Sequence, residues 1–514
     1  MESEVLERCC CVVKLLQPTK KPLSCSGVIV HPPTGTILCT GLLFSRFLAD
    51  TELLASDTRF LPAHDFSDQL RIRVSFSTGR GSHDPLPEEA PARLLMLVNC
   101  LEFKRAFQSL FRDSDQWRFY CDEEDEELIR DAHLLSWFAV LRTGVTAPGL
   151  ESISWKSSSD LVKGGAVVAC GSPFGSLCLD LFISTLSRGI ISNLWGEDHA
   201  VILTDARCLP GTEGGGLFAV DTAAHTVPLV GIIVSPFGWK SNEWIGLTLV
   251  CSLHVIIRSI IHCVNTQDPL RDLWAGSGGG DICMSTTAYE PGALSGYPTV
   301  CFVDSGYCWG SGVAVTSLLV LTCRHVVNGK STVTLTYHHG DRVRHIVGDV
   351  LFSTQPSSPY DLALVEMRHP YSEVIVPRMS QNFTPGDPVV VVGYGALGRS
   401  CGPSLTSGII SKTISLKHQP VMLQTTCAVQ GGTSGGAVVR NHTGELLGIV
   451  SSNTRDLAAK VTYPHLNFSI PVTVFQEQLQ EFHQTKDVNV FRMLDTPGKE
   501  VGRVWRLQGA QSKL

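Results

Sequence analysis

The sequence predicts an all-β dominated fold that occurs twice in tandem. Its composition supports the strands, because 43% of the 514 residues are hydrophobic, 17% are charged, and 47 glycines and 27 prolines suit short strands joined by tight turns. A repeat supports the duplication, because a series of short phrases in the first half returns in the same order about 200 residues later. Two related domains therefore follow one another along the chain.

The repeated phrases set the expected domain boundaries. In the first copy they are Cys25-Ser26-Gly27-Val28, Ser187-Arg188-Gly189-Ile190-Ile191-Ser192 and Gly211-Thr212-Glu213-Gly214-Gly215-Gly216. In the second copy they are Ser311-Gly312-Val313, Ser407-Gly408-Ile409-Ile410-Ser411 and Gly431-Gly432-Thr433-Ser434-Gly435-Gly436. We expect domains over 1–265 and 299–485, a Gly- and Ser-containing linker over 266–298, and a tail over 486–514.

Apolar runs separated by turn residues locate several elements of the first copy. Strands are expected over 25–30 and 37–42, around a Pro-Pro-Thr-Gly turn, and again over 137–141 and 166–170. Each copy should close on a C-terminal helix, over 250–262 in the first and 472–483 in the second. The polar stretch 73–92 and the acidic run 122–127 are expected to be exposed loops.

Charge and hydropathy exclude several partners. The net charge is −7 and no cluster of Lys and Arg occurs, so we expect no nucleic-acid binding. No uninterrupted run of about 18 apolar residues is present, so we expect no membrane span. His254, Arg258 and His262 recur every four positions and indicate the solvated polar stripe of a helix. Because Arg258 would repel a cation there, we expect no metal, and we expect no cofactor.

Both ends of the chain indicate its compartment. Met1-Glu2-Ser3-Glu4 is acidic where a secretory signal is basic, so we expect no export. Ser512, Lys513 and Leu514 form the tripeptide that the peroxisomal import receptor reads. We therefore expect the protein in the peroxisomal matrix, with this receptor as a partner and most of its 18 cysteines reduced and buried.

A serine between two pairs of glycines is the central candidate for chemistry. Glycines on both sides of Ser434 allow the backbone to turn its amides inward around a small side chain. An acyl-transfer enzyme needs this arrangement, with the amides of Gly432 and Ser434 facing the oxygen that becomes negative. A glycine-rich turn is also common without chemistry, so the interpretation depends on the rest of the chain.

Two further residues of the second copy complete a catalytic set. A serine nucleophile needs a base, and the base needs an orienting group. His325 stands at the end of a predicted strand over 318–322, and Asp361 directly precedes an apolar strand. The order His325, Asp361, Ser434, with intervals of 36 and 73 residues, is that of one of the known serine-protease triads.

At these residues the sequence resembles a known family. Its motifs are Thr322-Cys323-Arg324-His325, Tyr360-Asp361-Leu362-Ala363, Gly432-Thr433-Ser434-Gly435-Gly436 and Asn467-Phe468-Ser469-Ile470-Pro471. They resemble the Deg/HtrA branch of trypsin-like serine proteases, which implies two tandem chymotrypsin-like double β-barrel domains and a serine endopeptidase activity. With two copies and a Ser-Lys-Leu end, the chain is similar to the peroxisomal processing proteases of that branch. The resemblance implies imported matrix proteins as substrates, including leader-bearing enzymes of fatty-acid β-oxidation.

The first copy departs from the family pattern at each catalytic position. Leu42 stands where the histidine should be, and Trp137 fits best where the aspartate should be. Opposite Ser434 the alignment allows either Glu213 or Gly215. We therefore interpret the first copy as a pseudo-protease that packs against or regulates the second.

The substrate pocket is expected to be small and neutral. Six residues before the serine, where an acid selects basic substrates in trypsin-like pockets, the chain has Ala428. The other expected pocket residues are Gly448, Ile449, Val450 and Ser451. The resemblance implies cleavage next to cysteine, and the strand over 447–453 should pair with an extended substrate. Strand alternation predicts Cys323 as a wall of the site at best.

Several alternatives remain open from the sequence. Both copies could form a non-catalytic peptide-binding scaffold, or the triad could act on thioesters or esters. Self-cleavage within the loop over 73–92 is a further hypothesis, because an exposed loop is the first substrate a protease meets. A homo-oligomer is also left open.

Overall fold

The computed structural model describes most of the chain. The described residues are 2–513 without 18–21, 56, 78–87, 113–116, 121–131, 145–149, 151–152, 175–178, 222–225, 237, 241–242, 265–295, 340–341, 457–460 and 506–510. The chain divides into two compact units, one of residues 1–239 and 247–290 and one of residues 240–246 and 291–514. Residues 240–246, which the sequence assigned to the first domain, therefore belong to the second unit.

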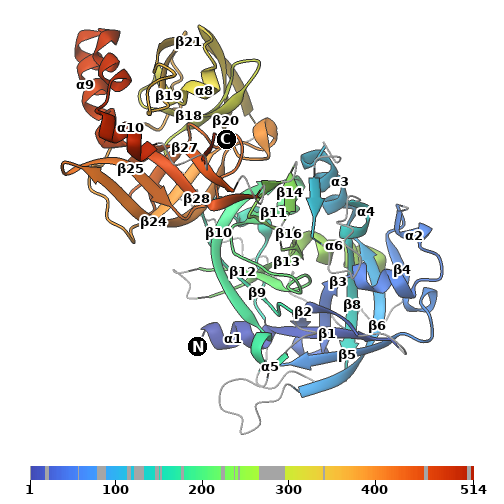
Figure 1. Cartoon of the computed structure of the whole chain (residues 1–514). Helices are drawn as coiled ribbons and strands as arrows, with labels where there is room; N and C mark the ends of the chain where they lie inside the picture. The colour runs from blue at the N-terminus through green and yellow to red at the C-terminus, as the bar shows by residue number, and fades with distance from the viewer. Residues whose placement is uncertain are drawn as a thin grey trace. The chain divides into compact units, whose positions relative to one another are not determined.

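The first unit contains two antiparallel barrels (Figure 1). The strands of one are β1 (Cys10–Leu16), β2 (Leu23–His31), β3 (Thr36–Thr40), β5 (Arg71–Phe76), β6 (Glu88–Asn99) and β8 (Trp137–Thr143), closed by pairing of β6 with β8 and extended by β4 (Phe60–Pro62). The strands of the other are β9 (Ala166–Gly171), β10 (Thr185–Trp195), β11 (Val201–Thr204), β12 (Gly216–Ala219), β13 (Leu229–Ser235) and β16 (Thr248–Ser252). Outside the barrels lie α1 (Glu2–Cys9), α2 (Glu52–Ala55), α3 (Leu101–Leu110), α4 (Ala132–Leu135), α5 (Leu179–Phe182), α6 (Leu253–Val264), β7 (Trp117–Phe119) and β14 (Gly238–Lys240).

The second unit repeats this arrangement. Its first barrel consists of β17 (Val300–Asp304), β18 (Trp309–Ala314), β19 (Leu319–Thr322), β20 (Thr332–His339), β21 (Arg342–Ser353) and β22 (Ala363–Met367). Its second barrel consists of β23 (Pro388–Gly393), β24 (Ser404–Leu416), β25 (Gln419–Thr425), β26 (Ala437–Arg440), β27 (Leu446–Asp456) and β28 (Val461–Pro471). The remaining elements are α8 (Arg324–Val327), α9 (Gln476–Thr485), α10 (Lys499–Trp505), β15 (Glu243–Trp244) and β29 (Gln511–Lys513).

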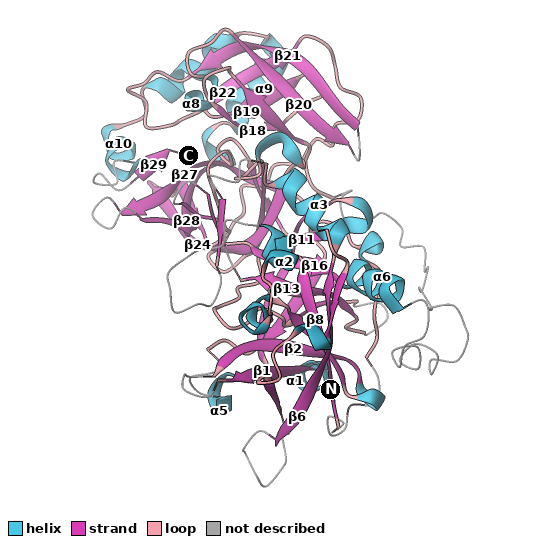
Figure 2. Ribbon diagram, turned by 90° about the vertical axis from the view of Figure 1, so that its right-hand side faces the viewer, coloured by secondary structure: helices cyan, strands magenta, loops and turns pink. Residues whose placement is uncertain are grey.

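The strand order is the same in both units. The first barrels run β1-β2-β3-β8-β6-β5 and β17-β18-β19-β22-β21-β20, and the second barrels run β9-β10-β11-β16-β13-β12 and β23-β24-β25-β28-β27-β26. Figure 2 shows that strands dominate throughout. The predicted fold, two tandem double β-barrels, is therefore confirmed.

Some predicted element boundaries are wrong. Residues 250–252 are not helical, because they lie in β16 and pair with β11 and β13, and the helix α6 begins only at Leu253. In the second unit, Val472–Val474 form a 3-10 turn before α9. The expected loop over 73–92 is shorter, since its two ends lie in β5 and β6. Its middle, the acidic run 122–127 and residues 266–295 of the linker lie outside the described residues.

The polar stripe of α6 is only partly solvated. Arg258 forms ion pairs with Glu102 at 2.8 Å and with Asp198 at 2.6 Å, so its guanidinium connects α6 to two other segments of the first unit. Within the described residues, no helix is long and apolar enough to span a membrane.

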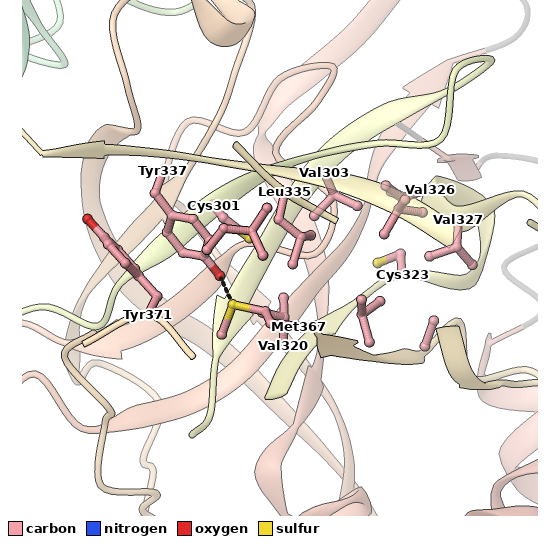
Figure 3. Packing of buried hydrophobic residues seen from close by; sticks show 14 residues of the cluster. Cys301, Val303, Val320, Cys323, Val326, Val327, Leu335, Tyr337, Met367 and Tyr371 are labelled. Carbon is pink, nitrogen blue, oxygen red and sulfur yellow. Dashed lines mark hydrogen bonds between the residues drawn. The ribbon is translucent and has the colours of Figure 1, made fainter. Parts of the chain in front are cut away.

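Buried thiols and aliphatic side chains fill the first barrel of the second unit (Figure 3). Cys301 and Cys323 lie among valines of this core, and the Tyr337 hydroxyl donates to Met367 Sδ at 3.1 Å. Burial raises the pKa of Cys301 to about 12, so this thiol stays protonated. No disulfide joins any of the 15 described cysteines, and most of them are buried.

The residues after α9 pack against the second unit. A 3-10 helix over Val488–Asp495 precedes α10. Trp505, at the end of α10, donates from Nε1 to the Val421 carbonyl at 3.1 Å and meets Tyr360 edge to face at 6.0 Å. Further on, β29 pairs antiparallel with β27, with Ser512 opposite Asn453. The residues that the sequence assigned to a tail thus extend the second unit.

Replacing Trp505 by Ala is expected to destabilise the second unit by about 3 kcal/mol, because it removes a buried aromatic side chain and its hydrogen bond. Trp505→Phe retains most of the packing and should cost about 1 kcal/mol. Urea unfolding followed by far-UV circular dichroism measures both. An alanine variant within 1 kcal/mol of wild type would contradict the contribution of α10 to this unit.

Candidate active site

His325 lies on a short helix directly after a barrel strand. The strand β19 ends at Thr322, and Cys323 precedes the helix α8, which contains His325. The backbone N–H of His325 donates to Asp361 Oδ1 at 3.0 Å, and His325 Nδ1 lies 2.7 Å from Asp361 Oδ2. A carboxylate only accepts hydrogen bonds, so Nδ1 is the protonated nitrogen and Nε2 is left as the acceptor. His325 and Asp361 are therefore brought together as the sequence predicted.

The loop that carries Asp361 is fixed by Arg324. Asp361 is buried, with 1% of its surface exposed. Arg324 Nη1 donates to the backbone carbonyls of Gln355 at 2.6 Å and Tyr360 at 3.2 Å. The Ser358 hydroxyl donates to the Leu494 carbonyl at 2.7 Å, so the residues after α9 also hold this loop.

Ser434 lies in a turn that only glycine neighbours allow. Gly432 and Gly435 have φ of +93° and +85°, in the left-handed region, and a Cβ at Gly435 would overlap the Ser311 carbonyl. The Ser311 N–H donates to the Ser434 carbonyl at 2.8 Å, and its hydroxyl donates to the Gly432 carbonyl at 2.9 Å. The Ser434 hydroxyl is buried and donates to the Ser451 carbonyl at 3.2 Å.

The serine turn and the histidine helix meet at β18. A Cβ at Gly310 would contact both Val326, next to His325, and the Ser434 carbonyl. From the other side, the Cys323 thiol donates to the Val450 carbonyl at 3.2 Å, next to Ser451. Cys323 is fully buried in the barrel core. It is the N-cap residue of α8 and lies just outside β19, so the alternation of side chains along a strand does not determine its orientation.

Cys323, His325 and Asp361 present possible metal-ligand atoms within 4.8 Å of one another. Metal binding by this group would require His325 Nδ1 to lose the proton that it shares with Asp361. The geometry therefore fits a hydrogen-bonded pair better than a metal site.

The predicted pocket residues differ in their surroundings. Ala428 is buried, and its Cβ lies close to Gly246. Gly448, Ile449, Val450 and Ser451 are consecutive on β27, and Val450 packs into the core of the second barrel rather than toward a pocket. Within this set, Ser451 contacts Ser434 through its backbone carbonyl.

The first unit keeps the frame of the serine turn without its serine. Gly211 has φ of +93° and Gly214 has φ of +84°, matching Gly432 and Gly435. The Ser26 N–H donates to the Glu213 carbonyl at 2.9 Å, as the Ser311 N–H does to Ser434. The structure therefore resolves the open alignment, because Glu213 takes the position of Ser434.

The side chain of Glu213 contacts the backbone of its own glycine turn. Its carboxylate accepts the Gly211 N–H at 2.8 Å. Gly211 corresponds to Gly432, whose amide the sequence predicts to bind an oxyanion. In the first unit the corresponding Gly211 N–H is already hydrogen-bonded to the Glu213 carboxylate.

Strand register also locates the other two positions. Thr322 pairs with Ala363 in the second unit, and Cys39 pairs with Ala139 in the first. Leu42 lies three residues after Cys39, as His325 lies three residues after Thr322. Trp137 lies two residues before Ala139, as Asp361 lies two residues before Ala363. Leu42 and Trp137 therefore occupy the positions of His325 and Asp361, in agreement with the sequence alignment. Trp137 Nε1 donates to the Leu54 carbonyl at 3.1 Å.

Three supporting residues were missed by sequence reasoning. Ser311 and Arg324 hold the serine turn and the aspartate loop, as described above. Gln430 is buried and donates from Nε2 to the Ile245 carbonyl at 2.5 Å. A signal existed for Ser311, because the phrase Ser-Gly-Val occurs at matching places in both copies as Ser26 and Ser311.

Comparison with known proteins agrees with this geometry. Residues 310–449 match the family described as a trypsin-like peptidase domain, so the class is that of trypsin-like serine proteases. The chain is 39% identical to "Peroxisomal leader peptide-processing protease" of Mus musculus, over 99% of this chain and 97% of that protein. It is equally identical to the protein of that name from Homo sapiens, over 96% of this chain and 94% of that protein.

A more distant similarity covers the second half. The chain is 32% identical, over 34% of its length and 36% of the other protein, to "Probable periplasmic serine endoprotease DegP-like" of Buchnera aphidicola. The chain belongs to the family of peroxisomal leader peptide-processing proteases. It is therefore a trypsin-like serine endopeptidase of the peroxisome, and the predicted relation to the Deg/HtrA branch is confirmed.

Replacing Ser311 by Ala is expected to lower kcat/KM by about 10- to 100-fold, because the serine turn loses a support and shifts relative to His325. The matched control is Ser26→Ala, which removes the corresponding bonds to Gly211 and Ser172 in the first unit. This control should leave kcat/KM within about twofold of wild type. Equal losses in both variants, measured on one peptide substrate, would contradict the assignment.

Proposed function

We propose that this protein cleaves peptide bonds with Ser434 as nucleophile, His325 as general base and Asp361 as orienting carboxylate. His325 Nε2 accepts the proton of Ser434 as the hydroxyl attacks the substrate carbonyl, and returns it to the leaving amine. The amides of Gly432 and Ser434 stabilise the oxyanion, each contributing about 3 kcal/mol. The observation that carries the proposal is the 2.7 Å contact of His325 Nδ1 with buried Asp361 in the unit that contains Ser434.

The family supports a class of substrate. Its curated members are called leader peptide-processing proteases of the peroxisome. We propose that this protein removes leader peptides from imported matrix proteins, including enzymes of fatty-acid β-oxidation, and that it cuts exposed loops and itself. The Ser-Lys-Leu end would bind the import receptor. The first unit, with Glu213 at the serine position, would be a non-catalytic partner of the second.

Buried polar groups support a polar residue before the cleaved bond. Asn453 lies on β27, two residues after Ser451, and is fully buried. Among the described residues, the side-chain amide of Asn453 makes no hydrogen bond. Leaving such groups unsatisfied costs about 1–3 kcal/mol, so a substrate side chain that pairs with them gains affinity. A cysteine thiol is small enough for a pocket with Ala428 and is a weak donor.

Replacing Ser434 by Ala is expected to abolish peptide cleavage and labelling by a fluorophosphonate, because no activated hydroxyl is left. Wild type and variant are incubated with peroxisomal matrix proteins, and the new N-termini are sequenced. Fragments of the protease that form only with wild type would support self-cleavage. Cleavage by the variant at the wild-type rate would contradict the proposed nucleophile.

Replacing Asn453 by Leu is expected to reduce the preference for cysteine over aminobutyrate before the cleaved bond by about fivefold, which corresponds to one lost hydrogen bond. The two peptides have the same shape and differ in the thiol. Exposed Asn382→Leu is the control and should leave the preference unchanged. An unchanged preference in Asn453→Leu would show that the Asn453 amide does not bind the substrate side chain.

A further inference from the structure

A short segment from the first half of the chain forms part of the second unit. Residues Glu243–Gly246, here called the 243–246 segment, lie between β14 and β16 in sequence. They nevertheless belong to the same compact unit as residues 291–514. The second unit is therefore built from two separate stretches of sequence.

The 243–246 segment packs beside the serine turn. The ring of Trp244 meets the edge of His465 on β28, with centroids 5.7 Å apart. A Cβ at Gly246 would contact His465, Pro464 and Ala428. Ile245 is buried, with 5% of its surface exposed.

The group bonded to the Ile245 carbonyl is Gln430, two residues before Gly432. The side chain of Gln430 is 6% exposed, donates to the Ile245 carbonyl at 2.5 Å and accepts the Ala396 N–H at 3.2 Å. Its backbone carbonyl accepts the Thr433 N–H at 3.0 Å. The start of the glycine turn is thus attached on one side to the 395–396 loop and on the other to the 243–246 segment.

The first unit provides a comparison from within the same chain. Leu209 occupies the place of Gln430, and its carbonyl accepts the Thr212 N–H at 3.1 Å as Gln430 does with Thr433. The side chain of Leu209 is 49% exposed, so the turn forms without any such anchor. The Gln430 anchor is therefore not required to build the turn, and it is present in the copy that keeps the serine.

We propose that Gln430 is a positioning residue for the oxyanion site and that the 243–246 segment holds it in place. The inference rests on the proposed function. The peptide between Gly431 and Gly432 has no side chain to restrain it, so its N–H can rotate away from the oxyanion. An oxyanion site is effective only when its donors are oriented before the reaction. Anchoring Gln430 on both sides supplies this orientation.

Gln430→Leu, which copies the first unit, tests the role of the anchor. We expect kcat to fall about 10- to 100-fold with KM within about twofold, because the donors are displaced without loss of the binding strand. The Kd of a peptide aldehyde, whose adduct with Ser434 bears the oxyanion, should rise by the same factor as kcat falls. Gln430→Glu keeps the acceptor for the Ala396 N–H but opposes the Ile245 carbonyl, and should behave like Gln430→Leu.

The same variants distinguish positioning from structural support. If Gln430 served only to stabilise the fold, the fraction of protein titrated by a fluorophosphonate would fall, while kcat per titrated site and aldehyde affinity would stay at wild-type values. That result, or wild-type kcat and aldehyde affinity in Gln430→Leu, would overturn the inference. Failure of the wild-type protein to react with the fluorophosphonate would instead contradict the proposed function.

A double-mutant cycle tests the 243–246 segment. Trp244→Gly with Ile245→Gly loosens the segment while retaining the carbonyl that Gln430 binds. Alone, this change should lower kcat in the same direction as Gln430→Leu, and combined with Gln430→Leu it should cause little further loss, because both act through one contact. Exposed Val376→Gly with Ile375→Gly serves as control. Fully additive losses would show that the segment and Gln430 act separately.

Discussion

The position of Ser434 depends on backbone hydrogen bonds from two barrels of the same unit. From the first barrel, the Ser311 N–H donates to the Ser434 carbonyl, and from the second, the Gly435 N–H meets the Val450 carbonyl at 2.8 Å. His325 and Asp361 are attached to the first barrel through β19 and β22. The distance between serine and histidine is therefore set by the packing of the two barrels.

The glycine turn and the hydrogen bonds that hold it do not require a serine at the centre of the turn. In the first unit the glycine conformations and the bonds from Ser26 are kept, while Glu213 fills the donor that an oxyanion would need. A turn that joins two barrels contributes to folding whichever side chain it presents. The side chain at its centre can therefore differ between the two units, Ser434 in one and Glu213 in the other, while the turn is kept.

The sequence predicted what local patterns encode. The repeat indicated two related domains, and the resemblance to Deg/HtrA proteases implied that each is a double barrel. The motifs around His325, Asp361 and Ser434 identified side chains that lie in one unit. Helix α6 begins later than expected, since an apolar run alone does not distinguish its first residues from β16. The contact of Gln430 with Ile245 could not be predicted, because 185 residues separate the partners and a backbone carbonyl has no sequence signature.

The pairing of β29 with β27 places a limit on peptide binding. The backbone of residues 452–454 faces β29, and an extended peptide added to β27 would need the same row of N–H and C=O groups. β29 occupies this edge, so an extended peptide that paired there would first have to displace residues 511–513. A tethered strand competes at an effective concentration on the order of millimolar. Residues 511–513 and an added peptide would therefore compete for the same edge of β27.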